Sequence, residues 1–168
     1  MNYTSVRDQI YTELAAVSGI GKVFKSKRLV EEWAPFLARF VINSRINVTW
    51  FTETSANEQW DSQLAENTDS DVIQYTERAE SWQIETFYGF DDADDADSPS
   101  EFAFQTLCEA IEAKFRFSQT LSATVDKVFP MRRVSSGLFV FSGGDVKVHR
   151  AEFQLTLRYR IANPAADS

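Results

Sequence analysis

Cysteine and histidine are nearly absent from this 168-residue sequence, which contains one of each. A single cysteine, Cys108, excludes an internal disulfide framework and a cysteine-rich zinc site. The single histidine, His149, cannot build a Ser-His-Asp arrangement without partners that no motif identifies. We expect Cys108 to be a small buried hydrophobic residue and His149 to be structural or on the surface. We expect no catalytic residue and no enzyme activity.

Long apolar runs are also missing. No run approaches the roughly 18–20 residues that span a bilayer, and residues 1–7 lack the apolar core of a signal peptide. The hydrophobic content of 43% and the aromatic content of 14% argue against disorder. The length predicts one domain that can bury a core. These features predict a protein made in the cytoplasm that has no membrane partner.

Positive charge is scarce in the middle of the chain. Residues 51–104 contain one basic and 15 acidic residues, a balance of −14, whereas the flanking segments 1–50 and 105–168 each carry +3. A nucleic-acid-binding domain shows the opposite pattern, a basic stripe that neutralises phosphates. The charge distribution therefore excludes a typical nucleic-acid-binding domain.

Motifs for metal and phosphate binding are incomplete. An acidic run before a helix contains Asp91, Asp92, Asp94, Asp95 and Asp97. It lacks the spaced Gly and the final Glu of an EF-hand loop, and the helix dipole stabilises such a segment without a metal. The segment Gly19-Ile20-Gly21-Lys22 is too short for a phosphate-binding loop. We expect no metal and no cofactor.

The strongest structural signal lies between Glu80 and Phe117. Residues 82–88 alternate between two kinds of side chain, which is typical of a strand. Ser98 and Glu101 form a capping box around Pro99, which predicts a helix start. One face of the following helix carries the apolar residues Phe104, Leu107, Cys108, Ile111 and Phe115. This segment predicts a strand, an acidic connection and an amphipathic helix.

The other segments have weaker patterns. The sequence predicts a helix at 5–17 that Gly19 ends, an entry strand at 21–24, a helix at 28–40 that is short or broken at Pro35, and strands at 46–52, 131–141 and 146–161. Residues 135–137 suggest a bulge or a break. Residues 121–129 fit either a short helix or an extended link. Residues 55–78 predict a long polar loop, with room for a strand at 72–75.

Together these elements predict an α+β fold in a single domain at residues 1–162. We expect a largely antiparallel sheet of about four to five strands, with two main helices packed on one face. A long acidic loop is expected around residues 55–80, and residues 163–168 are expected to form a flexible tail. Leu155, Leu157 and Phe153 should share a core with Leu107, Ile111 and Ile10.

The order of these pieces resembles a known family. The relevant stretches are Ala-Val-Ser-Gly-Ile-Gly-Lys-Val at 16–23, Phe-Tyr-Gly-Phe at 87–90, Ser-Glu-Phe-Ala-Phe-Gln-Thr-Leu-Cys-Glu-Ala-Ile at 100–111, and His-Arg-Ala-Glu-Phe-Gln-Leu-Thr-Leu at 149–157. From about Val6 to Ile161 the chain resembles tail-terminator, or tail-completion, proteins of tailed bacteriophages. It is longer than is usual for them between Glu58 and Glu80.

The resemblance implies a structural protein of the virion tail or neck, made in the cytoplasm of the host bacterium. Tail terminators form a hexameric ring that caps the tail tube and meets the head-side connector. The resemblance therefore implies a tail-tube protein and a head-completion or stopper protein as partners, with DNA passing through the ring. It transfers no catalytic or ligand residue. Another neck component, such as a stopper or head-completion protein, is the alternative. A small hydrolase or ligand-binding domain would need a pocket with convergent titratable groups.

Charge suggests two candidate surfaces in such a ring. Subunits that meet head to tail could pair an acidic surface with a basic one. The candidates are Asp91, Asp92, Asp94 and Asp95 on one side and Arg132, Arg133, Lys147 and Arg150 on the other. The alternative is that these charges are simply solvated. An acidic lumen would let DNA slide, and Glu53, Glu58, Asp61 and Glu66 are candidates for its wall or rim.

Overall fold

The computed structural model describes residues 3–27, 41–42, 45–61, 74–90, 99–140 and 147–163. The elements in chain order are α1 (Tyr3–Ala15), β1 (Lys22–Phe24), β2 (Val41–Ile42), β3 (Arg45–Asp61), β4 (Gln74–Gly89), α3 (Pro99–Phe117), β5 (Lys127–Val128), β6 (Arg132–Val140) and β7 (Lys147–Asn163). The helix expected at 28–40 lies outside the described residues. Neither of the two described helices is long and apolar enough to cross a membrane.

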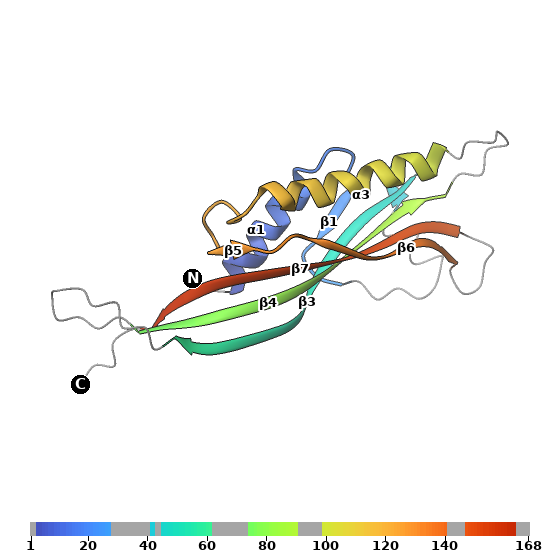
Figure 1. Ribbon diagram of the computed structural model, residues 1–168. Coiled ribbons are helices and arrows are strands. Elements are labelled where there is room, and N and C mark those ends of the chain that lie inside the picture. The colour runs from blue at the N-terminus through green and yellow to red at the C-terminus, as the bar shows by residue number, and fades with distance from the viewer. Residues whose placement is uncertain are drawn as a thin grey trace.

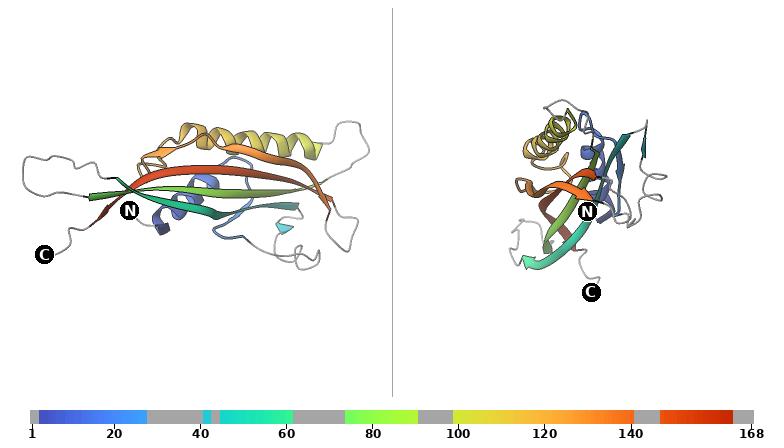
Figure 2. Two further views of the ribbon diagram at one scale, coloured as in Figure 1. Left: turned by 60° about the horizontal axis from the view of Figure 1, so that its bottom comes forward. Right: turned by 90° about the vertical axis from the view of Figure 1, so that its right-hand side faces the viewer.

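The strands form one sheet in the order β1-β3-β4-β7-β5, with β2 also on β3 and β6 also on β7 (Figure 1). Among the described strands, only β1 and β3 run parallel. Figure 2 shows the three long strands β3, β4 and β7 twisting along their length. The α+β prediction is confirmed, but the described part of the chain forms a sheet of seven strands rather than four to five. The two-residue strands β2 and β5 are too short to leave a detectable pattern in the sequence.

The prediction of a long loop around residues 55–80 is wrong at both ends. β3 continues to Asp61, β4 begins at Gln74, and the two strands pair from Ser55 opposite Ser81 to Asp61 opposite Tyr75. Residues 62–73 lie outside the described part of the chain. Opposite charges face each other there: Arg78 on β4 is the partner of Glu58 on β3, and their side chains lie 2.8 Å apart. Cross-strand pairs of this kind stabilise polar strands. The chain therefore forms a strand where its composition indicates a loop.

Two other segments differ from what the sequence predicts or leaves open. Asn163 belongs to β7 and pairs with Gln74, so the prediction that the tail starts at residue 163 is wrong. Residues 164–168 lie outside the described part of the chain. The link at 121–129 is neither a helix nor simply extended. It turns through three residues with positive φ, 121–123, and then forms β5 against β7.

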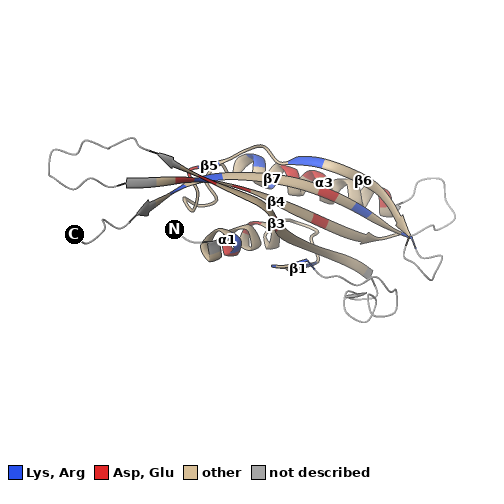
Figure 3. Cartoon of the chain, turned by 90° about the horizontal axis from the view of Figure 1, so that it is seen from below, with Lys and Arg blue, Asp and Glu red and all other residues tan. Residues whose placement is uncertain are grey.

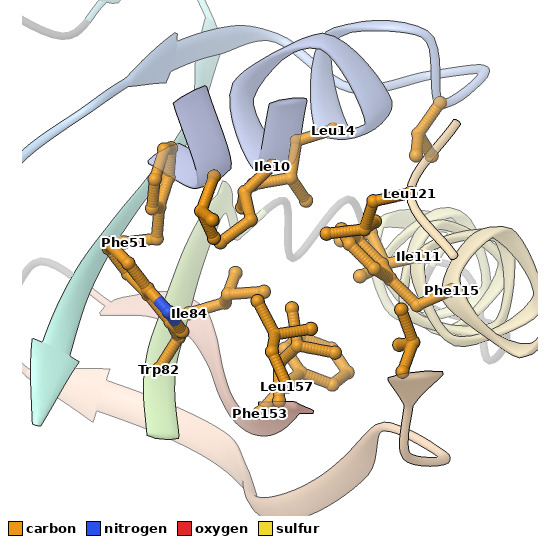
Figure 4. Packing of buried hydrophobic residues seen from close by; sticks show 14 of the residues in the cluster. Ile10, Leu14, Phe51, Trp82, Ile84, Ile111, Phe115, Leu121, Phe153 and Leu157 are labelled. Atoms are coloured by element: carbon orange, nitrogen blue, oxygen red, sulfur yellow. The ribbon is translucent and has the colours of Figure 1, made fainter. Parts of the chain in front are cut away.

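The main core lies between the sheet and the two helices (Figure 4). Ile10 and Leu14 of α1 and Ile111 and Phe115 of α3 meet side chains from the long strands. The strand residues share one face because they alternate along β4 and β7. The predicted core set is confirmed: Ile10, Leu107, Ile111, Phe153, Leu155 and Leu157 are all in this cluster. Full burial of such a side chain contributes about 1.5–3 kcal/mol.

The opposite face of the sheet also contains buried apolar residues. Val48, Trp50, Phe87 and Val148 are at most 5% exposed, although they do not belong to the main core. Trp50 and Phe87 contact each other with their ring centroids 4.8 Å apart. The prediction of helices packed on one face therefore accounts for the main core only.

The connection from α1 to β1 depends on two glycines. Gly19 has a φ of 79°, a conformation that glycine adopts without strain and that ends the helical region. A Cβ at Gly21 would lie 1.9 Å from the carbonyl oxygen of Asn47. The Asn47 side chain accepts a hydrogen bond from the Gly21 amide at 2.9 Å and donates one to the Gly19 carbonyl at 2.8 Å. These contacts hold β1 beside β3.

Candidate functional site: charged clusters and sheet edges

Strand β6 forms an exposed edge of the sheet. Among the described strands it pairs only with β7, and eight of its nine residues are exposed. The side chains of Val134, Leu138 and Val140 are 52%, 54% and 55% exposed. A β-bulge between Arg133 and Ser135 shifts the register in this strand. Soluble proteins usually protect such an edge, because its backbone groups and apolar side chains can bind another chain.

The opposite edge is formed by β3. Strands β1 and β2 pair with its first part, up to Trp50. All residues from Thr54 to Gln59 are exposed. The charges of the two edges differ: β6 begins with Arg132 and Arg133, whereas this part of β3 carries Glu58. Figure 3 shows that basic residues also occur along β7, next to β6.

Arg78 of β4 binds a group of acidic residues beside the β3 edge. Its guanidinium lies 2.8 Å from Glu58 and 2.7 Å from Glu80, and Glu53 lies 3.5 Å away. Burial, followed by the negative charge of Glu80, raises the pKa of Glu53. Glu58 remains 54% exposed, so its carboxylate can also bind a second cation from another molecule.

The buried member of this group, Glu80, has no exposed surface. Besides Arg78, it accepts hydrogen bonds from the Tyr159 hydroxyl at 2.7 Å and from the Trp82 indole at 3.0 Å. Burial and the hydrogen bond to Glu80 raise the pKa of Tyr159 well above its usual range. Because three donors already bind the Glu80 carboxylate, this cluster stabilises the fold and is a poor candidate for proton transfer.

A second cluster surrounds Glu85 on the other face of the sheet. Its carboxylate accepts hydrogen bonds from Trp50 at 2.6 Å and from Arg150 at 2.5 Å, and Lys27 lies 3.2 Å away. Burial alone would raise the pKa of Glu85, but the hydrogen bonds from Arg150 and Trp50 outweigh it and lower the pKa. Arg150 also stacks over the rings of Phe87 and Phe139. This arrangement is a buried carboxylate bound by two cations that remain partly exposed, and it is supported by aromatic side chains.

A serine and the only histidine of the sequence form an arrangement that resembles a hydrolase pair. Ser100 Oγ lies 3.0 Å from His149 Nε2. Both residues are buried, at 6% and 5% exposure, and His149 stacks on Phe104. A nucleophile must be reached by its substrate, so this pair fits a structural contact between the start of α3 and β7. Burial lowers the pKa of His149.

The basic residues predicted to lie in the interface fall into two groups. Arg133 is bound within the chain, by Glu112 at 2.9 Å and Gln105 at 2.8 Å, and Arg150 belongs to the Glu85 cluster. Arg132 and Lys147 are exposed. The aspartates proposed as their partners, Asp91, Asp92, Asp94 and Asp95, lie outside the described residues, as do Glu66 and the side chain of Asp61.

A groove between the two helices and the arrangement of possible metal ligands offer no stronger site. A shallow groove between the ends of α1 and α3 is lined by Glu13 and Lys114, which pair at 2.9 Å, and by Val17 and the exposed Phe117. Within the described ranges there is no group of three or more His, Cys, Asp or Glu residues arranged for a metal ion. The sheet edges are therefore the best candidate for a functional surface.

The sequence predicts β6 as a strand at 131–141 with a bulge or a break at 135–137, and the structure has a strand at Arg132–Val140 with a bulge between Arg133 and Ser135. That β6 lies at an edge of the sheet was not predicted. The polar end of β3 was predicted to be a loop, because it lacks an apolar alternation. Comparison with models of known protein families gives no match, and comparison with curated proteins finds no significant relative.

Proposed function

We propose that this chain is a structural protein of a tailed-bacteriophage virion, a tail terminator whose copies form a ring that caps the tail tube and joins it to the head-side connector. The observation that carries the proposal is the exposed edge strand β6, with its apolar residues Val134, Leu138 and Val140. An exposed edge strand of this kind favours association with another chain. The order of the sequence segments supports the particular family.

A structural role also agrees with the chemistry of the buried polar groups. In the described part of the chain, no buried side-chain nitrogen or oxygen lacks a hydrogen-bond partner. The buried carboxylates Glu80 and Glu85 accept hydrogen bonds from arginine and from aromatic side chains. These groups hold strands together. We propose that the protein is not an enzyme and needs no cofactor.

In the proposed ring, six copies surround a channel for double-stranded DNA. An acidic wall repels phosphate and a neutral wall does not bind it, so either lets the DNA move. The segment 51–104 has a balance of −14. We propose that part of this acidic segment, between Glu53 and Asp97, lines or rims the channel. The neighbours are a tail-tube ring on one side and a head-completion or stopper protein on the other.

The test is to produce virus particles that lack this protein. If it is the tail terminator, electron microscopy will show tails of uncontrolled length that are not joined to heads. Purified protein should show a hexameric mass by native mass spectrometry. Tails of normal length would contradict the terminator role, and if DNA also leaked from the heads, the result would favour a stopper.

A further inference from the structure

We propose that neighbouring subunits join by strand pairing, with β6 of one copy added to the free part of β3 in the next. This inference rests on the proposed ring and names the surface that builds it. The two edges lie on opposite sides of the same sheet, because the strand order places β3, β4, β7 and β6 in sequence. A contact between two different edges repeats from copy to copy and can close a ring.

The strand directions support this pairing. Each neighbouring pair among β3, β4, β7 and β6 is antiparallel, so β6 and β3 run in opposite directions. When a second copy is placed beside the first in the same orientation, its β3 lies antiparallel to β6. Antiparallel addition of a strand to an exposed edge is a common mode of recognition, in which backbone hydrogen bonds provide the affinity.

The short strands restrict how the two edges can meet. β1 and β2 cover β3 up to Trp50, which leaves Thr54–Gln59 exposed. The ladder registers place Arg132–Leu138 of β6 level with Asn47–Thr52 of its own β3. The midpoint of Thr54–Gln59 therefore lies roughly seven residues further along β3 than the midpoint of Asn47–Thr52, which is about 23 Å along a strand. Copies joined in this way are staggered, and their strands tilt as the strands of a closed barrel do.

The charges agree with the antiparallel direction. When β6 of one copy is centred on Thr54–Gln59 of the next, Arg132 at the start of β6 lies near the Gln59 end of that segment. Glu58 lies at the same end. Arg132 is exposed, and the Glu58 side chain is 54% exposed although it also binds Arg78. The apolar end of β6, with Leu138 and Val140, lies toward Thr54. A second copy of this chain thus offers the complementary edge.

Disulfide cross-linking tests the contact directly. Ser136 is at the middle of β6 and Ala56 is near the middle of the free stretch of β3, so paired cysteines at these positions should lie within the distance of a disulfide. We expect the variant Ser136→Cys/Ala56→Cys to give a ladder of covalent oligomers on mild oxidation. Ser136→Cys/Ala103→Cys is the matched control, because Ala103 is exposed on α3, and it should give no ladder. Placing the second cysteine at position 55 or 57, in place of Ser55 or Asn57, tests for a register that is shifted by one residue.

The outcomes separate this inference from the proposed function. Suppose that rings form but no cross-link appears with the second cysteine at position 55, 56 or 57. This result would overturn the proposed strand pairing and would not contradict the proposed function. A covalent dimer from Ser136→Cys alone would also overturn it, because it would show that two β6 strands meet. A protein that stays monomeric, in a virus whose tails are normal without it, would overturn the proposed function itself.

A charge exchange provides a second measurement. Arg132→Glu should weaken assembly roughly tenfold, since it replaces an attraction by a repulsion, and adding Glu58→Arg should restore it. Lys147→Glu is the control, because Lys147 is equally basic and exposed but lies outside β6. Equal effects of Arg132→Glu and Lys147→Glu, with no restoration by Glu58→Arg, would overturn the proposed pairing of Arg132 with Glu58.

Discussion

Tyr159 donates a hydrogen bond of 2.7 Å to Glu80, a residue 79 positions earlier in the chain, and the two meet inside the protein. Their strands β7 and β4 are neighbours, and Tyr159 lies opposite Arg78. The Glu80 carboxylate therefore receives donors from two strands at once. This contact joins the main core to the acidic edge of the sheet.

Replacing Glu80 by alanine should destabilise the protein strongly. The change leaves the Tyr159 hydroxyl and the Trp82 indole without their acceptor and removes a partner of Arg78. Removing one partner from a buried ion pair costs about 3–5 kcal/mol. Urea unfolding followed by tryptophan fluorescence would measure the loss. Tyr159→Phe, which removes one hydrogen bond, should cost about 1 kcal/mol; equal losses in the two variants would contradict the role given to Glu80.

Replacing Leu157 by aspartate should abolish folding. Leu157 has no exposed surface and lies in the main core, so the substitution buries an unpaired charge. Circular dichroism and thermal melting would show whether a folded protein remains. Gln154→Asp places the same side chain on the exposed face of β7, and it should change stability by less than about 1 kcal/mol. A Leu157→Asp protein that is soluble and melts normally would show that the core face is assigned wrongly.

Acidification should weaken the fold through His149. Burial among Ser100, Phe90 and Phe104 lowers the pKa of its imidazole, and the charge of Glu101 opposes this only in part. The unfolded chain therefore binds the proton first as the pH falls. The contribution of His149 is fully present above about pH 6.5 and is lost as the pH falls through the lowered folded-state pKa.

Urea unfolding at pH 7.5 and pH 5.5 would test this prediction. His149→Gln, which is neutral at both values and can still bond to Ser100, should reduce the difference in stability between them. An unchanged difference would assign the pH dependence to other groups.

Cys108 should not react in the folded protein. It is fully buried on α3, and burial raises the pKa of its thiol to about 11, so very little thiolate is present at pH 8. A thiol reagent such as Ellman's reagent should label it only after unfolding. Ala103→Cys, exposed on the same helix, should provide one rapidly reacting thiol. Fast labelling of Cys108 in the native protein would show that α3 opens readily.

The isolated protein should not bind duplex DNA at physiological salt. Its net charge is −8, and a protein that gains little from neutralising phosphates has little affinity for DNA. Fluorescence anisotropy with a labelled duplex would measure this. In a structure of the assembled ring, a channel wall dominated by Lys and Arg would contradict the acidic lumen proposed for residues 53–97.

The sequence alone determined the elements whose signals are local. The apolar face of α3, the entry of that helix at Pro99 and the alternation along β7 all arise from residues a few positions apart. Neighbours at these distances share one face of a helix or strand, so periodicity predicts both the element and its buried side. For the same reason, the core around Leu157 and Ile111 could be predicted.

Only the tertiary structure decided the parts that depend on distant partners. The polar stretch Thr54–Asp61 is a strand because β4 supplies its hydrogen bonds, and its own composition indicates a loop. The contacts of Arg78 with Glu58 and of Ser100 with His149 join residues 20 and 49 positions apart. Which strands lie at the edges depends on the strand order, and the order is set by the packing of the whole sheet. No local pattern records that order, because the energy that selects it comes from contacts between segments far apart in the chain.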